Sequence, residues 1–255
     1  MLLAVDVGNT NMVLGIFEGS NLLMHWRLST DHGRTCDEMG IITESLFAQL
    51  QMAPHNFNGV IIASVVPPMH RSLEQWSRIY LRQDPLWVTK GVKTGMPVRY
   101  DNPLEVGADR IVNAVAAYNA YRQRLIVVDF GTATTFDVVS DKGEYLGGAI
   151  TPGIIISCEA LFQKASRLPR VEIDGQPKRA IATNTMDSMH AGIIYGYAGM
   201  VDGLVRVIQN ELGGGAKVVA TGGIAPAISP HTSSIDEVDD LLTLKGLYFI
   251  YHLNR

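Results

Sequence analysis

Two short segments of the chain place a carboxylate, a glycine and hydroxyl-bearing residues at the end of an apolar strand. Val5-Asp6-Val7-Gly8 continues into Asn9-Thr10, and Val128-Asp129-Phe130-Gly131 continues into Thr132 and Thr134. Glycine lets backbone N–H groups approach an anion closely, and the Asn and Thr side chains add further donors. A nearby carboxylate suits Mg²⁺, which takes one or two protein carboxylates together with waters and phosphate oxygens. Two such turns that face one another could hold the phosphates of one nucleotide.

A single Asp-x-Gly turn is more simply interpreted as a hairpin turn with Asx hydrogen bonding. Two copies, each ending an apolar strand and each opening a repeated unit, favour phosphate binding instead. A third glycine pair, Gly222-Gly223 after Thr221, fits either a turn that lies against an adenine ring or a plain connection from strand to helix. The sequence contains neither Gly-x-x-x-x-Gly-Lys-Ser/Thr nor Gly-x-Gly-x-x-Gly, which disfavours a P-loop kinase and a Rossmann dehydrogenase.

Asp109 is the carboxylate whose surroundings best suit proton transfer. It follows Gly107-Ala108 at the start of a predicted helix, where the backbone can approach a small substrate. Phosphoryl transfer needs charge neutralisation, alignment and a group that accepts the proton of the attacking hydroxyl. The alternative is an acid that merely stabilises the first helical turn through the helix dipole and amide donors. Arg110 suits either a substrate carboxylate or solvent, and Tyr100 suits either a substrate or the core.

The elements that must position these residues follow from the apolar patterns. Strand, turn and strand cover residues 2–17, and a third strand follows at 22–28. The same pattern returns in the second half, with strand, turn and strand over 124–139 and a third strand over 145–150. The remaining predicted strands are 59–66, 86–88 and 217–221, and the predicted helices are 37–51, 69–82, 109–122 and 239–252.

The repeat of this unit at about half the chain length predicts two similar α/β lobes. We place the boundary between residues 1–117 and residues 118–255, with the helix at 109–122 joining the lobes. The sequence leaves open whether the closing helix at 239–252 packs back on the first lobe.

Composition excludes several classes of protein. A net charge of −4 disfavours a nucleic-acid partner, which would usually select a strong basic excess. The two cysteines lie far apart and match neither a disulfide framework nor a zinc site, which fits a reducing compartment. The N-terminus lacks the basic region of a secretory signal, and no uncharged apolar run approaches the roughly 18 residues of a membrane helix. We therefore expect a cytoplasmic protein without a nucleic-acid or membrane partner.

Taken together, the motifs resemble those of type III pantothenate kinases over essentially the whole chain. The residues that carry this resemblance are Asp6-x-Gly8-Asn9-Thr10, Arg34-Thr35-x-Asp37-Glu38, Gly107-Ala108-Asp109-Arg110, Asp129-x-Gly131-Thr132-Ala133-Thr134-Thr135, Gly147-Gly148-x-Ile150-x-Pro152-Gly153, Asn184-Thr185, Gly192-x-x-x-Gly196 and Thr221-Gly222-Gly223. The family belongs to the superfamily of actin, sugar kinases and heat-shock chaperone ATPases. The resemblance therefore implies an α/β fold of two similar ribonuclease-H-like lobes, with mixed five-stranded sheets flanked by helices and a nucleotide cleft between the lobes.

The resemblance also implies an activity. Members phosphorylate the primary hydroxyl of pantothenate to 4'-phosphopantothenate with ATP, the first step of coenzyme A biosynthesis, and Asp109 would be the general base. The implied pantothenate-binding residues are Tyr100, Gly107, Ala108, Asp109, Arg110 and Thr185. The implied ATP- and phosphate-binding residues are Asp6, Val7, Gly8, Asn9, Thr10, Asn11, Met12, Val13, Gly131, Thr132, Thr134, Gly222 and Gly223. Asp6 would organise Mg²⁺ or another divalent cation through water, and Asp129 would bind a monovalent cation, K⁺ or NH₄⁺.

Some residues keep two interpretations beside the resemblance. Thr185 either reaches pantothenate from the partner lobe or a second subunit, or is a helix N-cap. The small, apolar run from Gly192 to Gly199 fits either the interface of the homodimer that the family forms or packing within the chain. Asp137 is interpreted as solvated or structural. The alternative functions are another small-molecule kinase of the superfamily, and a nucleotide-binding regulator of gene expression without turnover.

Overall fold

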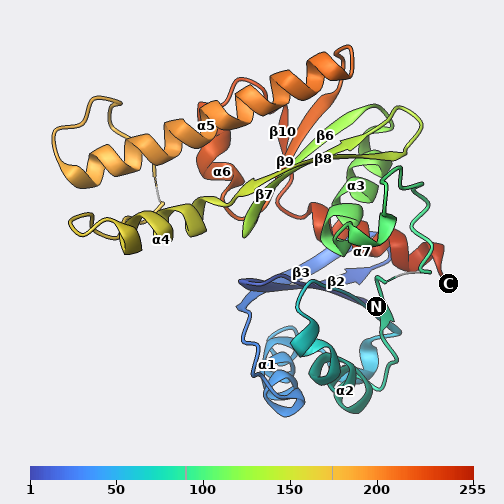
Figure 1. Cartoon of the computed structure of the whole chain (residues 1–255). Helices are drawn as coiled ribbons and strands as arrows, with labels where there is room; N and C mark the ends of the chain where they lie inside the picture. The colour runs from blue at the N-terminus through green and yellow to red at the C-terminus, as the bar shows by residue number, and fades with distance from the viewer. Residues whose placement is uncertain (90, 174) are drawn as a thin grey trace. The chain divides into compact units, whose positions relative to one another are not determined.

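Two mixed five-stranded sheets with the same strand order form the framework of the protein (Figure 1). The computed structural model describes residues 1–89, 91–173 and 175–255. The first sheet has the order β3-β2-β1-β4-β5 and the second the order β8-β7-β6-β9-β10. The first sheet consists of β1 (Leu2–Val7), β2 (Asn11–Glu18), β3 (Asn21–Ser29), β4 (Gly59–Ser64) and β5 (Leu86–Trp87). The second consists of β6 (Leu125–Phe130), β7 (Ala133–Val139), β8 (Tyr145–Pro152), β9 (Lys217–Thr221) and β10 (Glu237–Val238).

The pairing of the strands repeats as well. β1 is antiparallel to β2 and parallel to β4, and β6 is antiparallel to β7 and parallel to β9. The central strands β1, β4 and β6 are almost completely buried, as expected of strands covered on both faces. The predicted duplication, with a mixed five-stranded sheet in each half, is therefore confirmed.

Helices flank both sheets. They are α1 (Cys36–Ala48), α2 (His70–Tyr80), α3 (Ala108–Tyr121), α4 (Ile154–Lys164), α5 (Thr185–Glu211), α6 (Ala225–Ile228) and α7 (Leu242–Leu253). Short 3₁₀ turns lie at Pro54–Asn56, Pro67–Met69, Pro103–Glu105 and Ser229–His231. The predicted helices correspond to α1, α2, α3 and α7 within a few residues at each end, whereas α4, α5, α6 and β10 were not predicted as elements.

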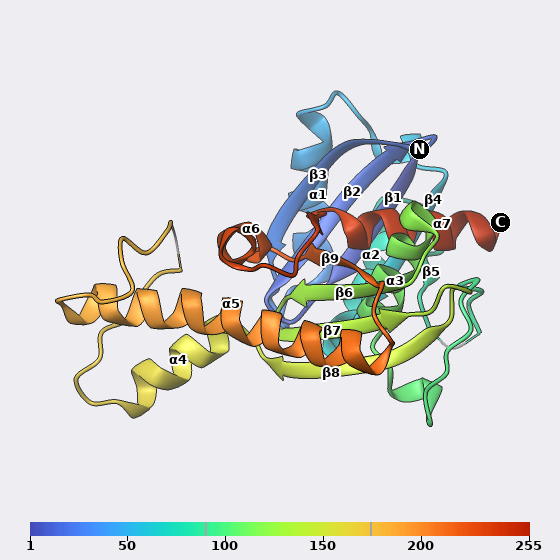
Figure 2. The ribbon, with the colours of Figure 1, turned by 90° about the horizontal axis from the view of Figure 1, so that it is seen from above.

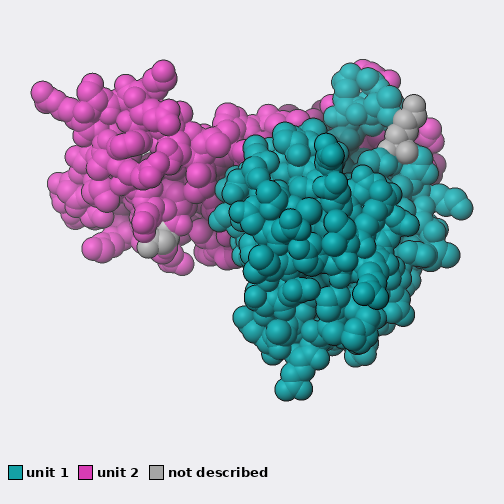
Figure 3. All heavy atoms as spheres, turned by 90° about the horizontal axis from the view of Figure 1, so that it is seen from below, with its two compact units in different colours: residues 1–95, 102–116, 243–255 teal, residues 96–101, 117–242 magenta. Residues whose placement is uncertain are grey.

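The chain contacts divide the molecule into two compact units (Figure 3). Unit 1 contains Met1–Gly95, Asn102–Ala116 and Thr243–Arg255, and unit 2 contains Met96–Asp101 and Ala117–Leu242. These units differ from the continuous segments 1–117 and 118–255 in three places, because residues 96–101 and Ala117 join unit 2 and residues 243–255 join unit 1. The lobe boundary predicted from the repeat stays a prediction.

In unit 1, helices lie on both faces of the first sheet (Figure 1). Phe47 of α1 and Trp76 of α2 are buried in a core with the apolar residues of β1, β2 and β4. The Trp76 indole N–H donates to the Thr43 hydroxyl at 3.0 Å, so this buried donor is satisfied. On the other face Leu244 of α7 lies against Gly15 of β2. The closing helix thus packs on the first sheet.

In unit 2, α5 crosses one face of the second sheet and continues past its end (Figures 1 and 2). Ile194, Val201 and Val205 of α5 are buried against apolar residues of β6, β7 and β9. The opposite side of the helix carries Gly192, Gly196, Gly199 and Gly203, and a Cβ added at any of them would meet no described atom within 4 Å apart from its chain neighbours and the helix's own backbone. Packing within the described chain therefore does not explain these glycines.

By length and composition alone, the long helix α5, with the residue that follows it (185–212), is apolar enough to span a membrane. It has a mean hydropathy of 1.3 over its most apolar window, of which 28% is buried. One face of the helix packs on the sheet, and Asp202 on it accepts hydrogen bonds from Ser233 and Ser234. The same composition is found in core helices, so the expectation that the protein has no membrane partner stays a prediction.

Candidate active site

The first Asp-x-Gly turn connects β1 to β2 and is closed by its own backbone. The Gly8 N–H donates to the Asn11 carbonyl at 3.0 Å. Thr30, directly after β3, ties the turn down twice: its hydroxyl donates to the Gly8 carbonyl at 2.7 Å, and its N–H donates to the Thr10 carbonyl at 2.9 Å. The turn is therefore held in shape without a ligand. Thr30 was missed by the sequence analysis, because only the three-dimensional structure brings it to the turn.

The residues predicted to bind ATP around this turn differ in whether their side chains are accessible to a ligand. Asp6 is half-buried, one position before the end of β1, and Asn9 and Thr10 are exposed. The side chains of Val7 and Met12 are fully buried, so these two residues could meet a ligand only through their backbone. A half-buried carboxylate beside exposed backbone and hydroxyl donors fits a hydrated divalent cation with phosphate oxygens.

The second turn connects β6 to β7 in a similar way. The Gly131 N–H donates to the Ala133 carbonyl at 3.1 Å, and Gly131 and Thr132 are exposed. The Gly153 N–H donates to the Thr132 carbonyl at 3.1 Å, and a Cβ on Gly153 would lie 2.6 Å from the Gly131 carbonyl oxygen. Gly153 thus shapes this turn, a role that its place in the Pro152-Gly153 motif did not reveal.

Thr134 differs from its neighbours in this turn. Its side chain is fully buried, and within the described part of the chain its hydroxyl has no hydrogen-bond partner. Thr134 also accepts a hydrogen bond from the Thr151 hydroxyl at its carbonyl, 3.1 Å away. A contact of Thr134 with the nucleotide stays a prediction, and the exposed donors of this turn are those of its neighbours.

Asp129 and Gly222 lie directly against one another. Asp129 pairs in register with Thr135 of β7 and with Thr221 of β9. Gly222 has a φ of +94°, and a Cβ there would lie 2.7 Å from the Asp129 Oδ1 and 2.6 Å from the Phe130 carbonyl oxygen. Both the backbone conformation and the space require glycine. The Thr221-Gly222-Gly223 segment is a connection from strand to helix, and its Gly222 also packs against the predicted cation carboxylate.

Asp109 lies in the first turn of α3, in unit 1, and its carboxylate folds back over Gly107. Its Oδ1 accepts the Arg110 N–H at 2.9 Å, as an acid at a helix start does. Burial raises the pKa of Asp109 above its ordinary value, and the Arg110 N–H and guanidinium charge only partly oppose this. The Arg110 side chain is 7% exposed, so it is not a solvated arginine.

Tyr100 lies on a short segment of unit 2 that runs beside β8. The Arg99 N–H donates to the Tyr145 carbonyl, and the Tyr145 N–H donates to the Pro97 carbonyl, both at 2.8 Å. The Tyr100 ring is half-buried, with its centroid 6.4 Å from that of Tyr145. Tyr100 therefore has a fixed ring at the surface of the unit, and its role as a substrate ligand stays a prediction.

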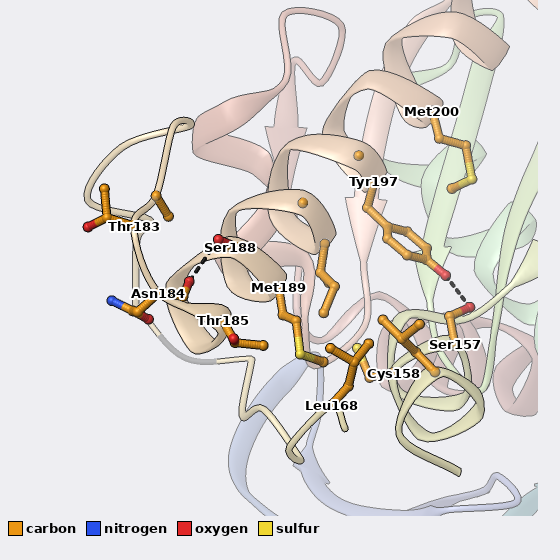
Figure 4. Close-up of a pocket in the computed structure, with 15 residues that line it drawn as sticks. Ser157, Cys158, Leu168, Thr183, Asn184, Thr185, Ser188, Met189, Tyr197 and Met200 are labelled. Atoms are coloured by element: carbon orange, nitrogen blue, oxygen red, sulfur yellow. Dashed lines mark hydrogen bonds between the residues drawn. The ribbon is translucent and has the colours of Figure 1, made fainter. Parts of the chain in front are cut away.

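Thr185 is the first residue of α5 and is exposed. The N-cap is Asn184, whose side chain accepts the Asp187 N–H at 2.9 Å, so the interpretation of Thr185 as the N-cap is wrong. Thr185 lines a groove of about 1050 Å³ between α4 and α5, where Cys158 and Met189 also lie (Figure 4). The start of α5 extends past the end of the second sheet in both ribbon views, away from the start of β8 where Tyr100 packs.

In the described ranges, no three His, Cys, Asp or Glu side chains gather as a metal cluster. A site of one carboxylate with water, as at Asp6, would not produce such a cluster.

Comparison with known proteins identifies the family. A family model described as type III pantothenate kinase matches residues 2–207. The chain is 56% identical to the type III pantothenate kinase of Syntrophobacter fumaroxidans and 57% identical to that of Myxococcus xanthus, over 100% of this chain and 99% of each relative. The Geobacter sulfurreducens relative is 55% identical over the full length of both chains. The chain belongs to the type III pantothenate kinase family. It is therefore an enzyme of the kinase class.

Solved structures agree at the level of the fold. A Campylobacter jejuni protein, whose name places it in a Baf family of transcriptional activators, superposes with a TM-score of 0.61 at 18% identity, over 99% of this chain and 98% of that one. An inorganic polyphosphate/ATP-glucomannokinase from an Arthrobacter species superposes with a TM-score of 0.52 at 14% identity, over 100% and 99%. The predicted sugar-kinase type of fold is confirmed, and these distant neighbours carry no information on substrate.

Proposed function

We propose that the protein phosphorylates the primary hydroxyl of pantothenate with ATP, which yields 4'-phosphopantothenate in the first step of coenzyme A biosynthesis. The observation that carries this proposal is the match to type III pantothenate kinases over the whole chain at 55% to 57% identity. The surroundings of Asp109 support it, because a carboxylate with a raised pKa has the proton affinity that general base catalysis uses.

In the proposed reaction Asp109 accepts the proton of the pantothenate hydroxyl as that oxygen attacks the terminal phosphate of ATP. Arg110, whose planar guanidinium matches a carboxylate, binds the acid group of pantothenate. Tyr100, Gly107 and Ala108 complete the substrate contacts within one chain. Glycine at position 107 leaves room for the Asp109 carboxylate, which a larger residue would displace.

The two Asp-x-Gly turns bind the phosphates of ATP through their exposed residues Asn9, Thr10 and Thr132. Asp6 orients the hydrated Mg²⁺, and Asp129 holds K⁺ or NH₄⁺. When bound, these cations neutralise the negative charge of the phosphates. Neither turn of this chain contains a lysine that could do so. The packing of Gly222 against the Asp129 carboxylate supports this role, because it keeps side chains away from the carboxylate oxygen.

We further propose that the protein is a homodimer and that the second copy covers the glycine side of α5. Gly192, Gly196, Gly199 and Gly203 recur at spacings of four and three, so they form one stripe on the helix. Apart from their chain neighbours and the helix's own backbone, nothing in the described chain lies within 4 Å of where their Cβ atoms would be. In this proposal Thr185 reaches the pantothenate bound by the other subunit, because its own chain leaves it far from Tyr100. A cytoplasmic location without nucleic-acid or membrane partners completes the proposal.

The test is the release of ADP from ATP and Mg²⁺, with pantothenate present or omitted, in potassium buffer and in sodium buffer. We expect release that requires pantothenate and increases in potassium. If pantothenate has no effect in either buffer, the proposal is wrong. A panel of other hydroxyl acceptors would then identify another small-molecule kinase, and ATP binding without turnover on any acceptor would favour the regulator.

Asp129→Ala tests the cation site separately. We expect this variant to lose most of the dependence of its rate on potassium concentration, since the carboxylate that attracts the ion is gone. An unchanged potassium titration would assign the cation to another position.

A further inference from the structure

Asp137 is a fully buried carboxylate in the middle of β7 that the proposed reaction does not use. Its Oδ2 accepts the Thr135 hydroxyl at 2.9 Å, and its Oδ1 accepts the Tyr145 hydroxyl at 2.6 Å. The interpretation of Asp137 as solvated is therefore wrong. Burial of a carboxylate costs free energy that well-packed apolar residues avoid.

Tyr145 connects this carboxylate to Tyr100. The hydroxyl of Tyr145 is fixed by Asp137, and its backbone N–H and carbonyl are bonded to Pro97 and Arg99, on the segment that carries Tyr100. The rings of Tyr145 and Tyr100 have centroids 6.4 Å apart and planes inclined by 52°, within the usual range for an aromatic pair.

The Tyr100 ring also lies close to Gly147 of β8. This residue has a φ of +115°, and a Cβ on it would lie 3.5 Å from the Tyr100 ring. A second attachment lies next to it, because the Arg99 guanidinium bonds Oε1 of Glu144 through Nε at 2.9 Å and Nη2 at 2.7 Å. Tyr100 thus lies on a segment whose backbone is bonded to Tyr145 of β8 and whose Arg99 side chain is bonded to Glu144, directly before β8.

The predicted cation carboxylate lies next to the first residue of this hydrogen-bonded chain. Thr135 pairs in register with Asp129, so the two side chains lie on the same face of the sheet, with Cβ atoms about 5 Å apart. One row of side chains therefore leads from the half-buried Asp129 and Thr135 to the buried Asp137 and Tyr145.

We propose that Asp137 and Tyr145 are positioning residues for Tyr100, and that they determine the affinity for the hydroxy-acid substrate. This inference rests on the proposed function, in which Tyr100 contacts pantothenate. Asp137 holds the Tyr145 ring at one tilt, and that ring fixes the plane in which Tyr100 meets the substrate. Neither residue touches the substrate.

The test compares Tyr145→Phe with Tyr118→Phe in the intact enzyme. Tyr118 is a matched control, because its hydroxyl also donates within unit 2, to the Asp141 carbonyl at 3.1 Å, but its ring packs on Gly143 rather than on Tyr100. We expect Tyr145→Phe to raise the KM for pantothenate about tenfold, with little change in the KM for ATP, and Tyr118→Phe to change neither. If Tyr145 has a purely structural role, Tyr145→Phe should lower Tm and the active fraction without changing the KM for pantothenate relative to the KM for ATP.

A double-mutant cycle separates positioning from other effects. In a Tyr100→Ala background Tyr145→Phe should cause no further rise in the KM for pantothenate, because the ring to be positioned is absent. Asp137→Asn is the second variant, since it keeps one acceptor oxygen and should raise the same KM by a smaller factor.

The outcomes distinguish this inference from the proposed function. If the wild-type enzyme does not use pantothenate, the proposed function fails and this inference fails with it. If the wild type is active and folded Tyr145→Phe and Asp137→Asn keep the wild-type KM for pantothenate, the inference alone is overturned. Equal effects of Tyr145→Phe with and without Tyr100 would also overturn it.

Discussion

Asp109 combines partial burial with a place in the first turn of α3, and these two features act in opposite directions on its pKa. Burial raises the pKa, while the Arg110 amide and guanidinium lower it, and the net result is a pKa above the ordinary value. A general base must be ionised to act, so the rate should fall as the pH decreases through this raised pKa. The acid limb of the kcat/KM profile, which reports the free enzyme, should therefore lie above the range of an ordinary aspartate.

Asp109→Asn should lower kcat by about 10²- to 10⁴-fold, the usual contribution of a positioned general base. Asparagine has nearly the same shape but accepts no proton from the attacking hydroxyl, so ATP binding should persist. Initial rates and ATP binding, measured on the same preparation, check both statements. A variant that keeps near-wild-type kcat would show that another group is the base.

The same substitution should increase stability at neutral pH. Because the folded-state pKa of Asp109 is raised, its contribution to stability is fully present below the unfolded pKa and is lost as pH rises through the folded pKa. Asparagine carries no charge and avoids this loss. Thermal unfolding at several pH values should give a higher Tm for Asp109→Asn at pH 7, with the difference from wild type decreasing toward acidic pH. A difference that grows as the pH falls would contradict the assignment.

At the scale of elements, the connection from β9 to α6 is shaped by a glycine that no other residue can replace without strain. Gly222 has both a positive φ and backbone atoms within 3 Å of the position of a Cβ. Gly215, just before β9, has a similar φ of +79° but open space around it.

Gly222→Ala and Gly215→Ala should therefore differ in a defined way. Both should lose about 1–2 kcal/mol of unfolding free energy from the left-handed backbone conformation. Gly222→Ala should lose about 1–3 kcal/mol more, because its Cβ must displace the Phe130 carbonyl or the Asp129 carboxylate. Urea unfolding of the two variants measures the difference. Equal losses would mean that the structure around Gly222 adapts without cost.

At the scale of the whole molecule, the glycine stripe of α5 predicts how the protein assembles. Gly196 lines the groove between α4 and α5, and apart from its chain neighbours and the helix's own backbone no described atom lies within 4 Å of a Cβ added there. The monomer fold should therefore accommodate the larger side chain of Gly196→Leu. If a second copy packs against this stripe, the added side chain should separate the subunits. Light scattering after size-exclusion chromatography should then report a monomer. Ser45→Leu on the exposed side of α1 adds the same side chain elsewhere and should leave the assembly unchanged.

The apolar pattern of the sequence was sufficient to predict the repeated strands and the helices that end each half. Apolar runs such as residues 59–66 and 217–221 encode burial directly, and glycine and proline mark where they stop. α6 and β10 are four and two residues long, so neither contains enough residues to produce a periodic signal. α5 was recognised as a small, apolar run rather than as a helix, because glycines interrupt its pattern and have low helix propensity.

The sequence by itself determined which residue types stand at the strand ends, that this arrangement occurs twice, and which family the motifs resemble. These are local properties, set by residues that are neighbours in the chain. Only the tertiary structure decided that Thr30 fixes the first turn, that Asp129 lies against Gly222, and that Asp137 is buried beneath Tyr145. Each of these contacts joins different strands or the turns at their ends, and such contacts depend on strand register and packing. Neither can be read from the order of residues within one segment.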